Sequence, residues 1–374
     1  MTRFAVNQER LLETFLRLVR IPSLSGQEGA VAHLVAASLG ELGLAVERDQ
    51  AHLQFGGEAG NVIARLPGPG PPILVCAHLD TVGPGDHISP RVSASRITSD
   101  GTTILGADDK AAVAGILEAV RVVLEQSLPH AALELVFTVA EEVGLKGAKA
   151  LDLGRLRSRL AYVADSEGRV GTMINRAPGQ DSIKAVLTGK AAHAGVAPEK
   201  GVNAIKMAGQ ALAAMRLGRL DEETTANIGL IRGGLATNIV PDRVELEGEA
   251  RSHRDDKREA QVQHMVECLH EAAAQMGGKV EVEITPMYRS FHIPDTHPVV
   301  RLGRLAMRQV GLRPRLEATG GGSDANVFNE HGMAAVLLGV GYRDCHTKRE
   351  YIPLAQLHKF AQLMVALLTA AARM

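Results

Sequence analysis

Residues 73–80 read Ile-Leu-Val-Cys-Ala-His-Leu-Asp, a short apolar run that ends in a histidine and an aspartate. A run of this length bounded by polar residues is typical of a buried strand. Residues 133–140 (LELVFTVA) and 160–165 (LAYVAD) have the same character. Between the first two runs, residues 110–126 place Ala, Val, Ile and Leu at three- and four-residue spacing, which predicts a helix with an apolar face. This order predicts an α/β fold: a mixed, largely parallel sheet with helices on both faces.

The pattern changes near the Ala-Pro-Gly sequence at residues 177–179. The next stretch predicts strand, helix, strand, strand, helix and strand at residues 182–189, 202–217, 225–232, 243–250, 255–276 and 279–288. This β-α-β-β-α-β order is that of ferredoxin-like α+β domains. We therefore expect an inserted domain at residues 179–292.

Helix and short-strand patterns return after Pro294, at residues 297–310, 335–340 and 354–372. The simplest interpretation is that the first domain resumes there. We expect one catalytic domain built from residues 1–178 and 293–374, a division consistent with ordinary domain sizes.

Composition excludes several classes of partner. Lys and Arg total 41 against 42 Asp and Glu, a net charge of -1, so no nucleic acid partner is expected. The three cysteines are far apart in sequence and cannot all pair, which indicates a reducing compartment. The N-terminus reads as an amphipathic helix rather than a signal peptide, and we found no apolar run of about 18 residues. We expect a cytoplasmic protein without a membrane span.

Potential metal ligands follow the predicted strands. The first run leads to His78 and Asp80, the second to Glu141 and Glu142, and the third to Asp165. Ligands bind beyond the carboxyl ends of strands in open parallel sheets, so these side chains should converge. Taken alone, paired glutamates after a strand are usually a solvated turn. So many acidic groups at one sheet edge instead require compensation, which a pair of divalent metal ions supplies.

Two local features qualify this hypothesis. Asp108, just before the 110–126 helix, reads as an N-cap about as well as a ligand. Consecutive residues of an extended chain point to opposite sides, so Glu141 and Glu142 can share one site only if a loop redirects one of them. Gly144 makes such a turn easy to form.

The chain resembles the zinc-dependent peptidase superfamily that includes peptidase T, carboxypeptidase G, aminoacylase and succinyl-diaminopimelate desuccinylase. The similar stretches are AHLDTV (77–82), GADDKAA (106–112), AEEVGLKGA (140–148), ADSEG (164–168), GKAAHAG (189–195), GGSDAN (321–326) and CHTKREYI (345–352). They occur in the family's order and span nearly the whole chain. GADDK together with an aspartate in ADSEG is most similar to the peptidase T branch.

The resemblance implies a role for each matched residue. Asp108 bridges two metal ions, His78 and Asp165 complete one site, and Glu142 and His346 complete the other. Asp80 orients the imidazole of His78 without touching metal. Glu141 is the general base. Zinc suits such a ligand set, and cobalt or manganese would also accept it.

The resemblance also implies substrate contacts within the inserted domain and the glycine-rich loop. His193 stabilises the oxyanion, usually in the partner subunit's active site, so a homodimer is expected. Asn238 and Arg251 line the substrate site, with Arg254 as an alternative to Arg251 for a substrate carboxylate. The loop around Gly322 lies beside the scissile bond in relatives.

The leading hypothesis is a di-zinc metallopeptidase that hydrolyses the N-terminal amide bond of short peptides. Recognition of the peptide's ammonium needs a carboxylate not used by metal, and the candidates are Asp109, Glu167 and Asp324. One alternative is an N-acyl-amino-acid or dipeptide deacylase on the same site. A non-catalytic scaffold is disfavoured because every matched ligand and the base keep competent side chains.

Overall fold

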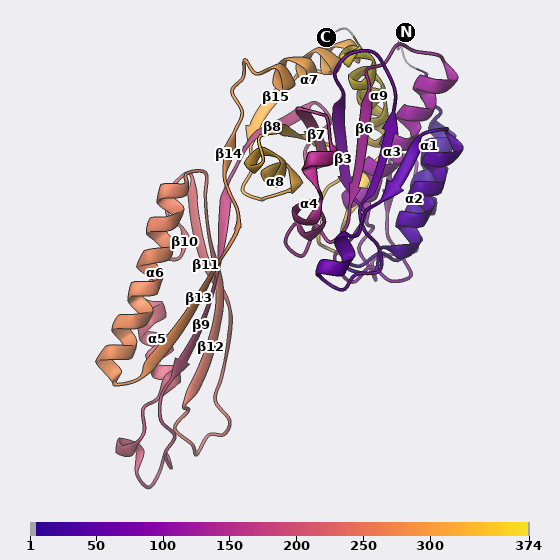
Figure 1. Cartoon of the computed structure of the whole chain (residues 1–374). Coiled ribbons are helices and arrows are strands. Elements are labelled where there is room, and N and C mark those ends of the chain that lie inside the picture. The colour runs from indigo at the N-terminus through magenta and orange to yellow at the C-terminus, as the bar shows by residue number, and fades with distance from the viewer. Residues whose placement is uncertain (1–4, 373–374) are drawn as a thin grey trace. The chain divides into compact units, whose positions relative to one another are not determined.

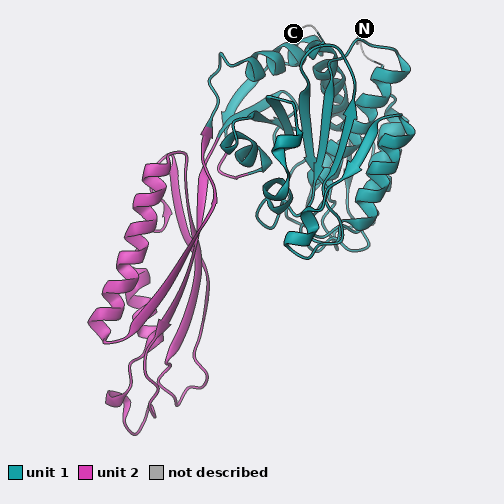
Figure 2. Cartoon of the chain, viewed as in Figure 1, with its two compact units in different colours: residues 1–176, 292–318, 323–374 teal, residues 177–291, 319–322 magenta. Residues whose placement is uncertain are grey.

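The computed structural model describes residues 5–372, so the predicted domain's residues 1–4 and 373–374 lie outside the described part. The chain divides into two compact units (Figure 2). Unit 1 comprises Met1–Arg176, His292–Ala318 and Ser323–Met374, and unit 2 comprises Ala177–Phe291 with Thr319–Gly322. The boundaries predicted after residues 178 and 292 lie within two residues of these. The short Thr319–Gly322 segment was not predicted to belong with the insertion.

Unit 1 contains a nine-stranded mixed sheet (Figure 1). Its central strands are β6 (Leu133–Thr138), β3 (Ile73–His78), β7 (Leu160–Ser166) and β16 (Ala334–Gly339), all parallel to one another. The flanking strands are β1 (Ala45–Arg48), β2 (Val62–Leu66), β8 (Thr172–Ala177), β14 (Phe291–His292) and β15 (Arg315–Ala318). The predicted parallel core is confirmed, and antiparallel pairs such as β2–β6 make the sheet mixed.

The two faces of β3 contact different helices, because alternate residues of a strand point to opposite sides. Val75 belongs to the hydrophobic core cluster that contains α3 (Ala107–Glu125). The sulfur of Cys76 instead lies 3.8 Å from Asp324, the first residue of α8 (Asp324–Glu330). The remaining helices of unit 1 are α1 (Gln8–Val19), α2 (Gly29–Glu41), α4 (Lys146–Ala150), α7 (Pro298–Gln309) and α9 (Leu354–Ala371). The parallel strands are therefore covered on both sides, as expected.

Helix α9 is long and apolar enough to cross a membrane by length and composition, but 72% of that segment is buried inside the structure. Phe360 packs against Gly115 of α3, where a Cβ would collide with its ring. These contacts are those of a core helix.

Unit 2 is an antiparallel sheet in the order β10–β11–β12–β9–β13. Its strands are β9 (Gly179–Thr188), β10 (Gly218–Arg219), β11 (Thr224–Gly233), β12 (Arg243–Ser252) and β13 (Lys279–Tyr288), with helices α5 (Ala204–Ala214) and α6 (Asp255–Met276). The four long strands have the predicted ferredoxin-like order, and β10 is an added short edge strand. Leu187, Met207 and Met265 are fully buried in the core between sheet and helices.

Candidate metal centre

The carboxyl ends of three adjacent parallel strands bring the predicted ligands of unit 1 together. His78 is the last residue of β3, Asp165 is the sixth residue of β7, and Glu141 and Glu142 follow β6. Because β6, β3 and β7 are parallel neighbours, their carboxyl ends meet at one edge. The predicted convergence is thus present in the fold.

A first group consists of His78, Asp108 and Asp165, whose ligand atoms all lie within 4.8 Å of one another. The Nε2 of His78 is 3.1 Å from Asp108 Oδ1 and 3.9 Å from Asp165 Oδ1. The Nδ1 of His78 lies 3.0 Å from the backbone carbonyl of Asp80 and 3.5 Å from its carboxylate. Asp80 thus fixes the ring on one side and leaves Nε2 facing the two aspartates.

A second group shares Asp108 and contains His346 and Cys345, again within 4.8 Å. The Nε2 of His346 is 3.3 Å from Asp108 Oδ2 and 3.0 Å from Glu142 Oε1. The two oxygens of Asp108 therefore face different histidines. Cys345 was not singled out from the sequence, although it stands beside His346 in the CHTKREYI stretch.

The turn after β6 places both glutamates at the site. Ala140 and Leu145 adopt positive φ angles of 51° and 60°, and Gly144 has φ of 106°. The carboxylate of Asp80 accepts the backbone N–H groups of Glu141 at 3.0 Å and Glu142 at 3.1 Å. The loop inferred from the adjacent glutamates and Gly144 is therefore present, and Asp80 holds it.

Asp108 is not a helix cap. The N-cap position of α3 is Gly106, and Asp108 has the non-helical angles φ −81° and ψ 104°. Its neighbour Asp109 is fully buried and accepts the backbone N–H of His78 at 3.2 Å. The capping interpretation of Asp108 is wrong, because its carboxylate oxygens face His78 and His346 rather than the helix's own N–H groups.

The crowding of acids shifts their protonation. Burial raises the pKa of Glu141 well above its ordinary value, and the nearby charge of Asp165 raises it further. Burial likewise raises the pKa of Asp165. Hydrogen bonds with Asp108 and Glu142 raise the pKa of His346 to about 10. The site therefore concentrates carboxylates whose negative charge a bound cation would compensate.

The substrate residues suggested by the family resemblance all lie in unit 2. The exposed His193 forms a β-bridge with Ile239, and the N–H of Ala194 donates to the carbonyl of Asn238 at 2.9 Å. His193 and Asn238 are therefore neighbours, beyond the Arg243 end of β12. Arg251 lies near the other end of β12, roughly 26 Å from Arg243 at about 3.3 Å per residue.

Arg251 is already paired. Its guanidinium donates two hydrogen bonds to Glu249, at 2.8 and 3.0 Å, and one to the carbonyl of Gly320 at 3.4 Å. Arg254 is likewise paired with Asp256. Arg251 and Gly320 border a cavity of about 280 Å³.

Gly322 has a packing reason to be glycine. A Cβ at this position would collide with the ring of Tyr288. The hydroxyl of Tyr288 in turn donates to Gln180 Oε1 at 2.5 Å. The close approach of the Tyr288 ring therefore requires glycine at position 322.

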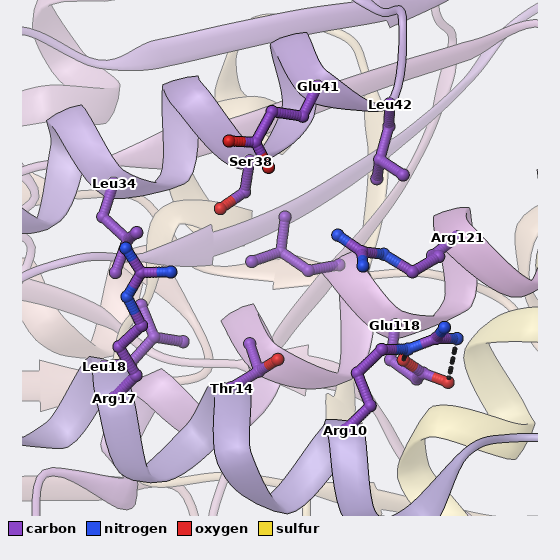
Figure 3. Close-up of a pocket in the computed structure, with 11 residues that line it drawn as sticks. Arg10, Thr14, Arg17, Leu18, Leu34, Ser38, Glu41, Leu42, Glu118 and Arg121 are labelled. Carbon is purple, nitrogen blue, oxygen red and sulfur yellow. Dashed lines mark hydrogen bonds and ion pairs between the residues drawn. The ribbon is translucent and has the colours of Figure 1, made fainter.

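A separate cavity of about 230 Å³ lies among α1, α2 and α3 and contains none of the expected site residues (Figure 3). Arg10 there pairs with the buried Glu118 at 2.7 Å and with Glu125 at 2.8 Å. These pairs join α1 to α3.

The comparison with known proteins gives a family match over most of the chain. Residues 74–370 match Peptidase family M20/M25/M40. The chain belongs to this family. It is a hydrolase of the peptidase class, as the resemblance implied.

Three relatives cover nearly the whole chain. The structure of aminopeptidase PepT from Bacillus cereus is 45% identical, with TM-score 0.90, over 98% of this chain and 99% of that one. A tripeptidase from Staphylococcus aureus is 41% identical, with TM-score 0.95, over 99% and 100%. The uncharacterized protein YqjE of Bacillus subtilis is 46% identical over 98% of this chain and 100% of its own length.

The residues present fit the dinuclear metal centre of this family. The donor set is imidazole and carboxylate, which divalent transition metals accept. The two groups of ligand atoms share Asp108, as a bridging carboxylate requires. Among the described residues, the buried Oδ1 atoms of Asp109 and Asp324 have no hydrogen-bond partner. Two carboxylate oxygens near the cluster therefore have an unsatisfied capacity to accept.

Proposed function

We propose that this chain is a dinuclear metallo-aminopeptidase that removes the N-terminal residue of short peptides. The observation that carries the proposal is the arrangement of Asp108, with one oxygen toward His78 and the other toward His346. The names of the Bacillus cereus and Staphylococcus aureus relatives, an aminopeptidase and a tripeptidase, support the substrate class.

In this proposal Asp108 would be shared by two ions, His78 and Asp165 would complete one site, and Glu142 and His346 would complete the other. Zinc is the expected metal, with cobalt and manganese as alternatives. Divalent ions held there would supply Lewis acidity toward the scissile carbonyl and lower the pKa of a coordinated water molecule.

Glu141 is the proposed proton carrier. Within residues 5–372 its carboxylate has no hydrogen-bond partner, so it is available to a water molecule and a substrate. Burial raises its pKa, which helps it keep a proton after taking one from the attacking water. Glu141 then passes this proton to the nitrogen of the leaving amine.

Glu167 is the best candidate for the peptide's ammonium group. It is exposed, and its Oε1 accepts the backbone N–H of Asp344 at 2.6 Å, two residues before His346. The other candidates, Asp109 and Asp324, are at most 1% exposed. An ammonium would have to lose its water to reach either of them, which is costly without full pairing.

We further propose that the protein is a cytoplasmic homodimer formed through unit 2. Leu230 and Ile231 on the outer half of β11 are 47% and 54% exposed, and Leu235 just beyond is 87% exposed. An apolar sheet edge of this kind is normally covered. The three free cysteines suit a reducing compartment.

The test compares free tripeptides with the same peptides acetylated at the amine, in wild type and in Glu167→Gln. Acetylation should lower kcat/KM of the wild type by at least ~10-fold, since a lost charge-assisted contact costs roughly 1.5–3 kcal/mol. In Glu167→Gln, kcat/KM should fall by the same factor with free peptides and change little with acetylated ones. Faster turnover of acetylated substrates would instead establish a deacylase.

A further inference from the structure

Glu350 is a buried carboxylate four residues after His346, with 1% of its surface exposed. Its Oε2 accepts the backbone N–H groups of Leu105 and Gly106, both at 2.7 Å. Its Oε1 accepts the backbone N–H of Asp108 at 2.9 Å. One side chain therefore holds three N–H groups of the segment that carries the shared aspartate.

One of these bonds, from the N–H of Asp108, does the work that a helix cap would otherwise do, while Leu105 and Gly106 precede α3. The first N–H groups of a helix have no partner within it, and a short side chain at the N-cap usually accepts one. Gly106 at the N-cap of α3 has no side chain for this purpose. Glu350 instead accepts the N–H of Asp108 from outside the helix, while the carboxylate of Asp108 faces His78 and His346.

Glu350 also ends the loop that carries His346. Its own N–H donates to the carbonyl of Thr347 at 3.1 Å, and Tyr351 begins strand β17 (Tyr351–Pro353), which pairs with β5 (Arg96–Thr98). The carboxylate thus lies between the loop that carries His346 and a short paired strand, which together fix its position.

We infer that Glu350 is a positioning residue that sets the separation of Asp108 and His346. It joins the two backbone segments that carry these side chains, whose facing atoms lie 3.3 Å apart. The inference rests on the proposed function, in which Asp108 and His346 hold the same ion. The affinity for that ion should depend on Glu350 more than the affinity for the ion held by His78 and Asp165.

The experiment is a zinc titration of metal-free protein against a competing chelator. Wild type should take up two ions, and His346→Ala identifies which binding step belongs to the His346 site. Glu350→Gln keeps the volume but turns an NH₂ group toward one of the backbone N–H donors. This variant should weaken the His346-site step by about 10–100-fold, the usual effect of disturbing a group behind a metal ligand, and leave the other step within a few-fold.

Glu134→Gln is the matched control. Glu134 is also buried and accepts the N–H groups of Arg157 and Ser158 and the hydroxyl of Ser158, at 2.6–3.0 Å, near the start of β6. It should lower the unfolding temperature without changing either binding step.

The outcomes separate the two proposals. Wild type that binds fewer than two ions would overturn the dinuclear site itself. If wild type and Glu350→Gln bind both ions with the same affinities, only the positioning role is overturned. Should Glu350→Gln fail to fold, Glu350→Asp replaces it, because the shorter carboxylate keeps the charge but cannot reach all three N–H groups. Wild-type affinities in Glu350→Asp would equally overturn the role.

Discussion

The carboxylate of Asp80 accepts the backbone N–H of Glu141 at 3.0 Å, although the two residues are 61 positions apart in sequence. Asp80 also accepts the N–H of Glu142 and the hydroxyl of Ser25, the latter at 2.6 Å. Its role is therefore wider than orientation of the His78 ring. Asp80 places the proposed base and the proposed ligand Glu142 at the same time.

Asp80→Asn tests this role. An asparagine has one acceptor oxygen and must direct its NH₂ toward the N–H of either Glu141 or Glu142, so the 140–142 turn should shift. We expect kcat/KM to fall by about 10–100-fold. Steady-state kinetics with a tripeptide, combined with zinc analysis, measures this. Unchanged kcat/KM with full metal content would show that the turn holds its position without Asp80.

Glu141→Gln should separate catalysis from metal binding. The amide cannot take a proton, so kcat should fall by roughly 10²–10⁴-fold, the usual contribution of a positioned general base. Metal content should remain near that of wild type because Glu141 is not a proposed ligand. Asp108→Ala is the contrasting variant and should lose both ions. Near-normal turnover in Glu141→Gln would exclude the proton-carrier role.

The parts of the fold found from the sequence are those with strong local patterns. The apolar strands β3, β6 and β7 and the helix α6 lie within a few residues of their predicted ranges. The short strands β1 and β15 were missed because only four residues each, partly exposed, leave little periodicity to detect. Tertiary pairing rather than local pattern makes them strands.

Some residues of the candidate site could likewise be predicted from local sequence, and others could not. His78 and Asp165 could be found because each stands at the end of an apolar run. Glu350 could not, because it acts on backbone N–H groups about 240 residues away, and no residue type marks such a donor. The pairing of Glu249 with Arg251 had a signal that went unused, since residues two apart in a strand share one face.

The metal-free protein should lose stability as pH rises. Burial raises the folded-state pKa of Glu141 and Asp165, and Asp108 and Glu142 raise that of His346 to about 10 from 6.5. All three groups keep protons in the folded state that the unfolded chain releases, so unfolding is favoured as pH rises. The contribution of His346 is fully present below pH 6.5 and is lost between pH 6.5 and about 10.

Thermal unfolding with a chelator at about pH 6 and about pH 9 measures this effect. The unfolding temperature should be lower at the higher pH, and zinc should reduce the difference because it replaces the bound protons. His346→Ala should show a smaller difference than wild type. An unfolding temperature that rises between these pH values would contradict the interpretation.

Glu142 rather than Cys345 should complete the His346 site. The Glu142 oxygen lies 3.0 Å from His346 Nε2. Burial and the surrounding carboxylates, Asp108 first among them, raise the pKa of the Cys345 thiol and oppose formation of the thiolate that a metal needs. Absorption spectra of the cobalt-loaded protein should therefore be unchanged in Cys345→Ser and altered in Glu142→Gln. A near-ultraviolet thiolate–cobalt band that disappears in Cys345→Ser would assign the ligand to Cys345.

His193 should act on the active site of a partner copy. Within unit 2, His193 and Asn238 lie beyond one end of β12, while Arg251 lies near the other, so one copy of unit 2 cannot gather all three around a short peptide. Two copies could each supply one half. His193→Ala and Glu141→Gln should each be nearly inactive alone, for different reasons.

Mixing these two inactive variants provides the test. After dissociation and reassembly, half of the dimers should be mixed, and each mixed dimer should hold one site with Glu141 from one copy and His193 from the other. The mixture should therefore recover about a quarter of wild-type activity, given random pairing of equal amounts. The double variant His193→Ala/Glu141→Gln mixed with wild type is the matched control, because its mixed dimers contain no site with both Glu141 and His193. In that control each mixed dimer has one site lacking the base and one lacking the imidazole, so activity should come only from wild-type dimers. If instead the two single variants stay inactive after verified exchange, or wild type is a fully active monomer, His193 does not work across a dimer.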